Sequence, residues 1–488
     1  MSFDAANQEA VCEIAEAPNP AVTQEAVPLP VMPARRPALD PRTRRLLEAP
    51  IAATLVRLAA PNMVVMVVQA SLGLVETYFV GWLGTAALAG ITLVFPAVML
   101  MQMMSAGAVG GGIASAVARA LGAGRTEDAD RLAVHAVAIG VGFALVFSVT
   151  ALLGGRMLYA AMGGAGPALD AALTYSNIVF AGMVLIWVFN ALANIIRGTG
   201  NMAFPALVSI AGTVILVPLS PCLIFGWGPF PRLGIAGGGV ALLLYYALGV
   251  AVLGWYLAAG RSVVRLRRSG WRLEKRLFGE ILRVGAVAAL ITVGTNATVA
   301  ITTALVGHFG PSAIAGYGVG SRLEYLLVPL VFGLGSPLVA MVGTNIGAGR
   351  GDRALRTAWI GAAIAFGLTE TIGLIAAAMP LAWLSLFDHD PTMLAAGAQY
   401  LRIVGPCYGL FGLGMALYFA AQGAGKLRWP LIAAVSRFVI AAGGGWLAFR
   451  LTGDLFYVFI ALAVALAAFG LINAAAVAAG AWFGKPAR

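Results

Sequence analysis

The sequence predicts an all-α polytopic membrane protein, with twelve transmembrane helices in two parallel six-helix repeats around a central cleft. Three observations lead to this fold class. Of the 488 residues, 60% are hydrophobic and only 10% are charged, whereas soluble domains carry about 25% charged residues. Many apolar runs exceed the roughly 20 residues that span a bilayer as a helix. Short motifs of the first half recur in the second half, which indicates a duplication.

Each helix is expected where a long apolar run lies between short polar turns. The first six runs cover residues 52–82, 86–118, 128–154, 171–196, 203–226 and 234–260. The second six cover residues 278–308, 312–345, 354–386, 394–421, 430–450 and 455–483. The order of apolar runs therefore accounts for nearly the whole chain after residue 50.

Basic residues gather in every second connection, as the positive-inside rule predicts for cytoplasmic loops. Arg125, Arg197 and Arg350 are examples. This alternation explains the formal net charge of +11 without a nucleic acid partner. It also supports an even number of helices, with both termini in the cytoplasm and a multi-pass location in the bacterial inner membrane.

The domain organisation follows from the charge pattern and the runs. Residues 1–48 are rich in Glu, Pro, Ala and Arg and lack the apolar core of a signal peptide, so we expect a disordered cytoplasmic tail. An N-terminal six-helix lobe covers 49–260, an Arg-rich cytoplasmic linker covers 261–277, and a C-terminal six-helix lobe covers 278–488.

The duplication is visible as a nearly constant offset between the halves. "VGWLGTAALAG" at residue 80 recurs as "VGHFGPSAIAG" at residue 306, an offset of 226, and "LGAGR" at 121 recurs as "IGAGR" at 346, an offset of 225. The predicted pairs are Gly84 with Gly310, Gly124 with Gly349, Tyr175 with Tyr400, Pro205 with Pro430 and Glu76 with Thr302. Because each copy has an even number of helices, the two copies enter the membrane in the same orientation.

The sequence offers little for catalysis. It contains no Walker A motif, and its three histidines and three cysteines are too scattered for a metal site, a catalytic triad or a disulfide framework. We therefore expect that the protein is not an enzyme and that it binds no cofactor and no metal. The glycines of "LGAGR" and "RGTGN" are interpreted as tight turns, and a gating role for Arg125, Arg197 and Arg350 is the alternative.

Three acids lie inside predicted helices, where ionisable groups are costly and rare: Glu76, Glu324 and Glu370. Glu76 lies about six residues from the predicted outer end of its helix, roughly 9 Å at 1.5 Å per residue. We expect it to bind the coupling ion, with a proton favoured over sodium and with Ser220 and Gln69 supplying hydrogen bonds. The alternative is a glutamate that only reaches the interface or satisfies a neighbouring helix. Glu370 and Glu324 are the second choices.

A substrate cleft would be lined by flexible and aromatic side chains. Methionine thioethers fit varied apolar ligands and aromatic faces hold cations, so the candidates are Met101, Met104, Trp187, Tyr408 and Tyr418. Packing inside the lobes or contact with lipid is the alternative for all five.

These motifs together resemble those of a multidrug and toxic compound extrusion (MATE) transporter. The resemblance rests on "VETYFVGWLGTAALAG", "LGAGR", "RGTGN", "GVGSRLEYLLVPLVFGLG", "IGAGR" and "QGAGK" and covers roughly residues 50–485. It implies an antiporter that exports amphipathic, often cationic, organic compounds in exchange for protons or sodium ions. Family members often carry Asp in a "VDT" pattern where this chain has "VET", so the resemblance also points to Glu76.

The resemblance leaves one alternative within membrane transport, a flippase for lipid-linked substrates of the same superfamily. The expected partners are a small-molecule substrate, a proton or sodium ion and membrane lipid, and the protein is expected to be a monomer.

Overall fold

The structure is a computed structural model that describes residues 40–266 and 273–482. Within these ranges every regular element is a helix, which confirms the predicted all-α class. Eleven helices are long and apolar enough to cross a membrane, and a pair bent by 49° makes a twelfth if it counts as one span. This agrees with the twelve predicted runs.

The helices follow the predicted runs closely. The first half contains α2 (Ile51–Gly81), α3 (Thr85–Gln102), the π-helix η1 (Met103–Val109), α4 (Gly110–Gly122), α5 (Thr126–Ala161), α6 (Gly166–Ala181), α7 (Met183–Gly198), α8 (Ala203–Phe225) and α9 (Ile235–Ala258). The second half contains α10 (Lys275–Gly307), α11 (Pro311–Gly347), α12 (Gly351–Ala378), α13 (Pro380–Leu384), α14 (Pro391–Val404), the 3-10 helix η3 (Gly405–Cys407), α15 (Tyr408–Ala424), α16 (Arg428–Val439), the π-helix η4 (Ile440–Gly444), α17 (Gly445–Thr452) and α18 (Leu455–Ala478).

An additional short helix, α1 (Pro41–Glu48), precedes them. Leu46 and Leu47 are buried, and the Arg350 guanidinium donates a hydrogen bond to the Leu47 carbonyl at 2.9 Å. The prediction of a disordered tail up to residue 48 is therefore wrong for residues 41–48, because the two leucines give this segment an apolar face to bury. Residues 1–39 lie outside the described residues.

The linker prediction also needs a correction at its end. The helix α10 begins at Lys275, inside the predicted linker 261–277. Residues 267–272 of that linker lie outside the described residues. On the other side of them, the Arg265 N–H donates to the Asp130 carboxylate at 2.7 Å, so a contact to α5 holds the first part of the linker.

The repeated motifs adopt the same backbone conformation in both halves. Gly84 and Gly310 precede α3 and α11 with φ of 105° and 99°, and Gly124 and Gly349 lie just after the ends of α4 and α11 with φ of 75° and 72°. Such positive φ angles favour glycine, since a Cβ atom makes them costly. The interpretation of "LGAGR" and "RGTGN" as tight turns is confirmed at Gly124 and Gly200, whose φ angles are 75° and 83°.

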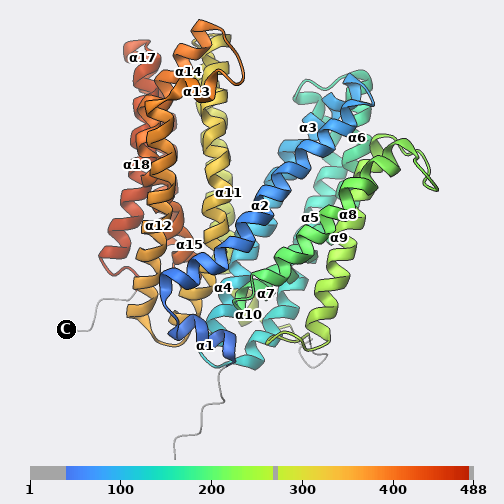
Figure 1. The fold of residues 1–488 in the computed structure, drawn as a ribbon, viewed down its shortest axis with the longest axis vertical. Coiled ribbons are helices and arrows are strands. Elements are labelled where there is room, and N and C mark those ends of the chain that lie inside the picture. Colours follow the sequence, from blue (N-terminus) through green and yellow to red (C-terminus); the bar gives the residue numbers. More distant parts are fainter. Residues whose placement is uncertain (1–39, 267–272, 483–488) are drawn as a thin grey trace, which may run out of the picture. The chain divides into compact units, whose positions relative to one another are not determined.

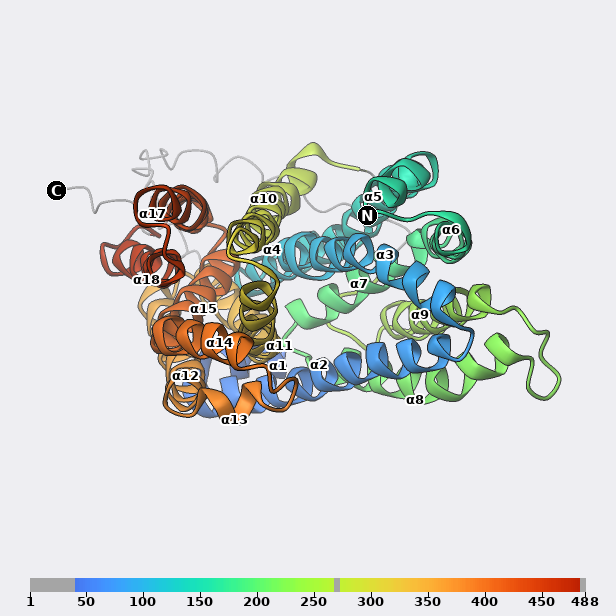
Figure 2. The ribbon, with the colours of Figure 1, turned by 90° about the horizontal axis from the view of Figure 1, so that it is seen from above.

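Figures 1 and 2 show the helices gathered by half. The helices α3, α5, α6, α8 and α9 lie together, and α12, α14, α15, α17 and α18 lie together. One apolar core contains mostly first-half side chains such as Trp187, joined by Leu277 and Ile281 of α10, and another contains second-half side chains such as Phe459. A third apolar cluster joins the halves, because it contains Leu55 and Ala114 from the first half and Leu338 and Ala420 from the second.

The two halves meet closely where α4 packs against α11 and α15, a contact that we call the interlobe seam. A Cβ atom on Gly122 would lie 2.0 Å from the Thr344 carbonyl oxygen, so the two backbones touch. The Ser115 hydroxyl donates to the Gln422 carbonyl at 2.5 Å. Figure 1 shows α1 and α4 at the same end of the helices, so the seam lies at the end that carries the basic loops.

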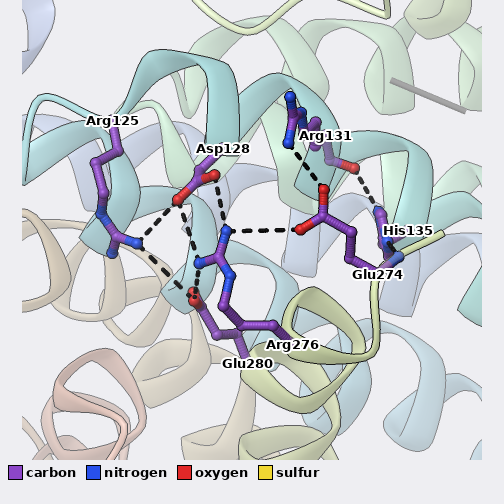
Figure 3. Close-up of polar contacts among 7 residues, drawn as sticks. All are labelled: Arg125, Asp128, Arg131, His135, Glu274, Arg276 and Glu280. Atoms are coloured by element: carbon purple, nitrogen blue, oxygen red, sulfur yellow. Dashed lines mark hydrogen bonds and ion pairs between the residues drawn. The ribbon is translucent and has the colours of Figure 1, made fainter. Parts of the chain in front are cut away.

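A cluster of ion pairs connects α5 to the start of α10 at the same end (Figure 3). Asp128 accepts from Arg125 at 2.9 Å and from Arg276 at 2.9 Å. Arg276 also bonds Glu280 at 3.0 Å. The side chains are partly exposed, so each pair contributes about 0–1 kcal/mol. Together they hold the start of α10, the first helix of the second half, against the start of α5.

His135 is the buried member of this cluster. Its Nδ1 lies 2.8 Å from the Arg131 carbonyl oxygen, and its Nε2 lies 2.7 Å from the Glu274 backbone nitrogen. Since a backbone N–H donates, Nε2 is the acceptor and Nδ1 carries the proton that bonds the carbonyl. The neutral imidazole therefore bridges α5 and the segment that leads into α10.

Replacing His135 with alanine is expected to destabilise the protein by about 1–3 kcal/mol, because the Glu274 N–H loses its partner. The check is the thermal unfolding midpoint of the purified chain in detergent. The control is His389→Ala, since His389 is exposed and its loss should change stability by less than about 0.5 kcal/mol. Equal midpoints for the two variants would contradict the bridging role.

Candidate functional site

Glu76 lies on α2, five residues before its last residue, Gly81. The Tyr175 hydroxyl of α6 donates a hydrogen bond to Glu76 Oε1 at 3.3 Å. Gly238 of α9 faces the same atom, because a Cβ atom there would lie 3.3 Å from Oε1. Three helices of the first half therefore meet at this carboxylate.

The carboxylate of Glu76 has no basic partner among the described residues, since no Lys, Arg or His nitrogen there forms an ion pair with it. The neighbouring Tyr175 ring is buried, with 7% of its surface exposed. A carboxyl group in such surroundings can exist as the neutral acid or together with a bound cation. Both possibilities suit a group that takes up and releases an ion.

Neither of the two residues predicted to bond Glu76 does so among the described contacts. Ser220 is buried in α8, and its hydroxyl has no hydrogen-bond partner among the described residues. Gln69 of α2 is exposed and interacts instead with the Tyr245 hydroxyl. Glu76 therefore lies between helices, but its hydrogen-bonding side chain is Tyr175 and not Ser220 or Gln69.

A polar network that the sequence analysis missed lies beside this region. Asn190 Nδ2 donates to the Ser105 hydroxyl at 2.7 Å and to Gln102 Oε1 at 3.4 Å. Gln102 Nε2 in turn donates to the Tyr246 hydroxyl, which also interacts electrostatically with Glu76. The available signal was the presence of amide side chains inside apolar runs, where polar groups need partners.

The predicted cleft residues lie in packed regions of this conformation. Met101, Trp187, Tyr408 and Tyr418 expose 0%, 1%, 0% and 5% of their surface, and Met104 is half-buried against the first core. Trp187 stacks on Phe143 with ring centroids 5.4 Å apart. The structure therefore supports the packing alternative for these side chains.

The second-choice acids have different surroundings. Glu370 of α12 accepts the Gly409 backbone N–H at 2.7 Å. That N–H lies in the first turn of α15, where backbone donors have no partner within their own helix. Glu370 therefore caps α15 after the break at η3, which is a structural role.

Glu324 of α11 resembles Glu76 more closely. The Tyr400 hydroxyl donates to Glu324 Oε1 at 2.8 Å, and the carboxylate interacts electrostatically with the buried Arg437. Tyr400 is the repeat partner of Tyr175. Each half thus has a tyrosine bonded to an acid, but Glu76 comes from the first helix of its repeat and Glu324 from the second.

The family of the chain follows from a comparison with known proteins. A family model described as MatE matches residues 61–222 and 288–447, one segment in each half. The chain belongs to the MatE family. The resemblance to MATE transporters is thereby confirmed, and the protein is a multi-pass membrane transporter rather than an enzyme.

Two relatives illustrate the range of MatE proteins. The FAD transporter of Shewanella oneidensis is 29% identical over 374 residues, which are 75% of this chain and 81% of that protein. The probable multidrug resistance protein NorM of Deinococcus radiodurans is 29% identical over 408 residues, which are 80% of this chain and 87% of that protein.

Solved structures share the fold. The outward-facing conformation of a multidrug resistance MATE family transporter matches with a TM-score of 0.81 at 22% identity, over 91% of this chain and 99% of that chain. A MOP superfamily transporter from Pyrococcus furiosus matches with a TM-score of 0.81 at 23% identity, over 91% of this chain and 98% of that chain.

Proposed function

We propose that this MatE protein is a secondary active exporter of amphipathic organic cations, driven by protons that bind Glu76. The observation that carries the proposal is a carboxylate between three helices, bonded by Tyr175 and without a basic partner among the described residues. A proton is favoured over sodium because the hydrogen bond to Glu76 seen among the described contacts comes from a tyrosine hydroxyl, and hard cations prefer several oxygen ligands.

The direction of transport is inferred from the charges and from the relatives. The basic loops lie at the end of the interlobe seam, and the positive-inside rule assigns this end to the cytoplasm. The seam then closes the cytoplasmic side, so the Glu76 region would exchange with the outer solution in this conformation. Relatives named as multidrug resistance proteins support export.

The test is transport by the full chain in proteoliposomes with an imposed proton gradient, using ethidium as the amphipathic cation. Export of ethidium that depends on the pH difference and persists without sodium supports the proposal. Dependence on sodium alone would assign the coupling ion differently. Transport of a sugar or an amino acid without any response to ethidium would contradict it.

Two other substrates belong in the same assay. Flavin adenine dinucleotide is included because a relative is named as an FAD transporter, and a fluorescent lipid tests the flippase alternative. Exchange of either compound with no movement of ethidium would replace the proposed cation with that class of substrate.

Changing Tyr175 to phenylalanine is expected to lower proton-driven export about threefold to tenfold, because one hydrogen bond to Glu76, worth roughly 0.5–1.5 kcal/mol, is lost. The matched control is Tyr400→Phe in the other half, which removes the equivalent bond to Glu324. We expect the pH dependence of export to shift in the first variant only. A shift in the Tyr400 variant alone would move the coupling site to the second half.

A further inference from the structure

Three of the short glycine motifs meet around one cavity at the interlobe seam. The cavity has a volume of about 420 Å³. Its wall contains Ala123 and Arg125 of "LGAGR", Ile346 and Gly347 of "IGAGR", and Ala424 and Gly425 of "QGAGK", together with Arg119, Glu280, Arg283 and Val284. The motifs thus do more than end helices, because they enclose a space between the two halves.

The wall of this cavity is strongly basic. It carries three arginines, Arg119, Arg125 and Arg283, against one acid, Glu280. Arg125 forms an ion pair with Asp128 at 2.9 Å and a longer one with Glu280 at 3.9 Å. The cavity therefore keeps an excess of positive charge.

Neither of the remaining two arginines forms an ion pair with an acid of the described residues, although Glu280 also interacts electrostatically with Arg119. The Arg119 Nη1 donates to the Ser115 hydroxyl and, at 3.2 Å, to the Gly423 carbonyl, which are both neutral acceptors. Arg283 is exposed, and no carboxylate of a described residue lies within ion-pair distance of it. Their remaining N–H groups are free to bind an anion.

The glycines hold the backbone close enough to form this wall. A Cβ atom on Gly347 would lie 2.1 Å from the Arg119 carbonyl oxygen, and one on Gly425 would lie 3.1 Å from Arg119 Nη1. Arg119 and Arg125 belong to the first half, whereas Arg283 and Gly347 belong to the second. The cavity consequently exists in this form only while the seam is closed.

We propose that this cavity binds the phosphate group of an anion and thereby stabilises the closed seam. Guanidinium groups present planar pairs of N–H donors that match phosphate oxygens, and such charge-assisted bonds are roughly twice as strong as neutral ones. A volume of about 420 Å³ far exceeds the share of one water molecule, about 30 Å³. A ligand that binds one conformation shifts the equilibrium towards it. This site is independent of the substrate and ion proposed above.

The phosphate group could belong to a free anion or to the headgroup of an anionic lipid, and the experiment separates the two. The full chain is purified in a neutral detergent, inorganic pyrophosphate is added, and the thermal unfolding midpoint is followed. In a second arm, the chain is placed in nanodiscs of neutral phosphatidylcholine with or without phosphatidylglycerol. A higher unfolding midpoint with pyrophosphate identifies a free anion as the ligand. A higher midpoint with phosphatidylglycerol alone identifies a lipid headgroup.

The variant that tests the site is Arg283→Gln, because Arg283 is exposed and should be dispensable for folding. In this variant, the anion that raises the unfolding midpoint of the wild type is expected to bind about tenfold or more weakly, since a charge-assisted bond is lost. The matched control is Arg356→Gln, because Arg356 is an exposed arginine of α12 that does not line the cavity, and its response should equal that of the wild type. An unfolding midpoint that neither pyrophosphate nor phosphatidylglycerol raises would overturn the proposal. An equal increase in the Arg283 and Arg356 variants would overturn it as well.

Discussion

Proton-driven export by the Glu76→Gln variant is expected to fall to no more than about a tenth of the wild-type rate, because an amide cannot take up and release a proton where the carboxylate does. Glutamine keeps the size of the side chain and can still accept the Tyr175 hydroxyl bond. Folding and substrate binding should therefore persist. The measurements are ethidium export in proteoliposomes with an imposed pH difference, and ethidium binding to the purified chain.

The matched controls are the same substitution at the two other acids. Glu324→Gln keeps an acceptor for Tyr400, and Glu370→Gln keeps an acceptor for the Gly409 N–H. Both variants are expected to retain more than about half of the export rate if coupling depends on Glu76, since surviving hydrogen bonds limit the loss. Wild-type export by the Glu76 variant would reject its role, and loss in the Glu324 variant alone would assign coupling to the second half.

The second large effect is expected at the interlobe seam. An alanine at Gly122 would place its Cβ atom 2.0 Å from the Thr344 carbonyl oxygen. Overpacking of this kind costs about 1–3 kcal/mol, which is a factor of about 5 to 150 in a two-state equilibrium. We expect the conformation with the closed seam to lose about 1–3 kcal/mol of stability relative to the open one. The rate of export should fall as a result, while the helices remain folded.

Distances across the seam would measure this shift directly. Spin labels at Glu127 and Asp352, which are exposed and related by the repeat, would report one population in the unmodified protein and a longer distance in the Gly122 variant. The control is Gly142→Ala, because a Cβ atom on Gly142 would meet nothing within 4 Å. An unchanged distance in the Gly122 variant would show that the seam does not have to fit this tightly.

The fold could be predicted from the sequence because its strongest determinants are local. Apolar runs longer than a bilayer leave only helices as a solution, and glycines that recur at one offset mark turns that recur in the structure. The short helix α1 was not predicted, since Leu46 and Leu47 are buried by contacts with residues far away in the sequence, such as Gly200 and Arg350.

The site could be predicted only in part. Glu76 is conspicuous because a charge inside an apolar helix is costly. Its neighbours depend on how the helices are rotated relative to one another. The spacing of residues along the sequence therefore predicts neither the contacts of Ser220 nor the network of Gln102 and Asn190. Methionine and aromatic side chains serve cores and clefts equally well, which explains why the sequence left both possibilities open for Met101 and Trp187, which pack in the first core.

Each half has a tyrosine that bonds an acid, but the two sites are not identical. Tyr175 and Tyr400 occupy the same place in the repeat, but their acids come from different helices, and Thr302 stands where a second copy of Glu76 would be. A homodimer of six-helix subunits would carry two identical sites, because one gene would encode both and its symmetry would make them equal. Fusion of the two copies into one polypeptide removes that constraint, so mutations can accumulate in one half while the other keeps its ancestral chemistry.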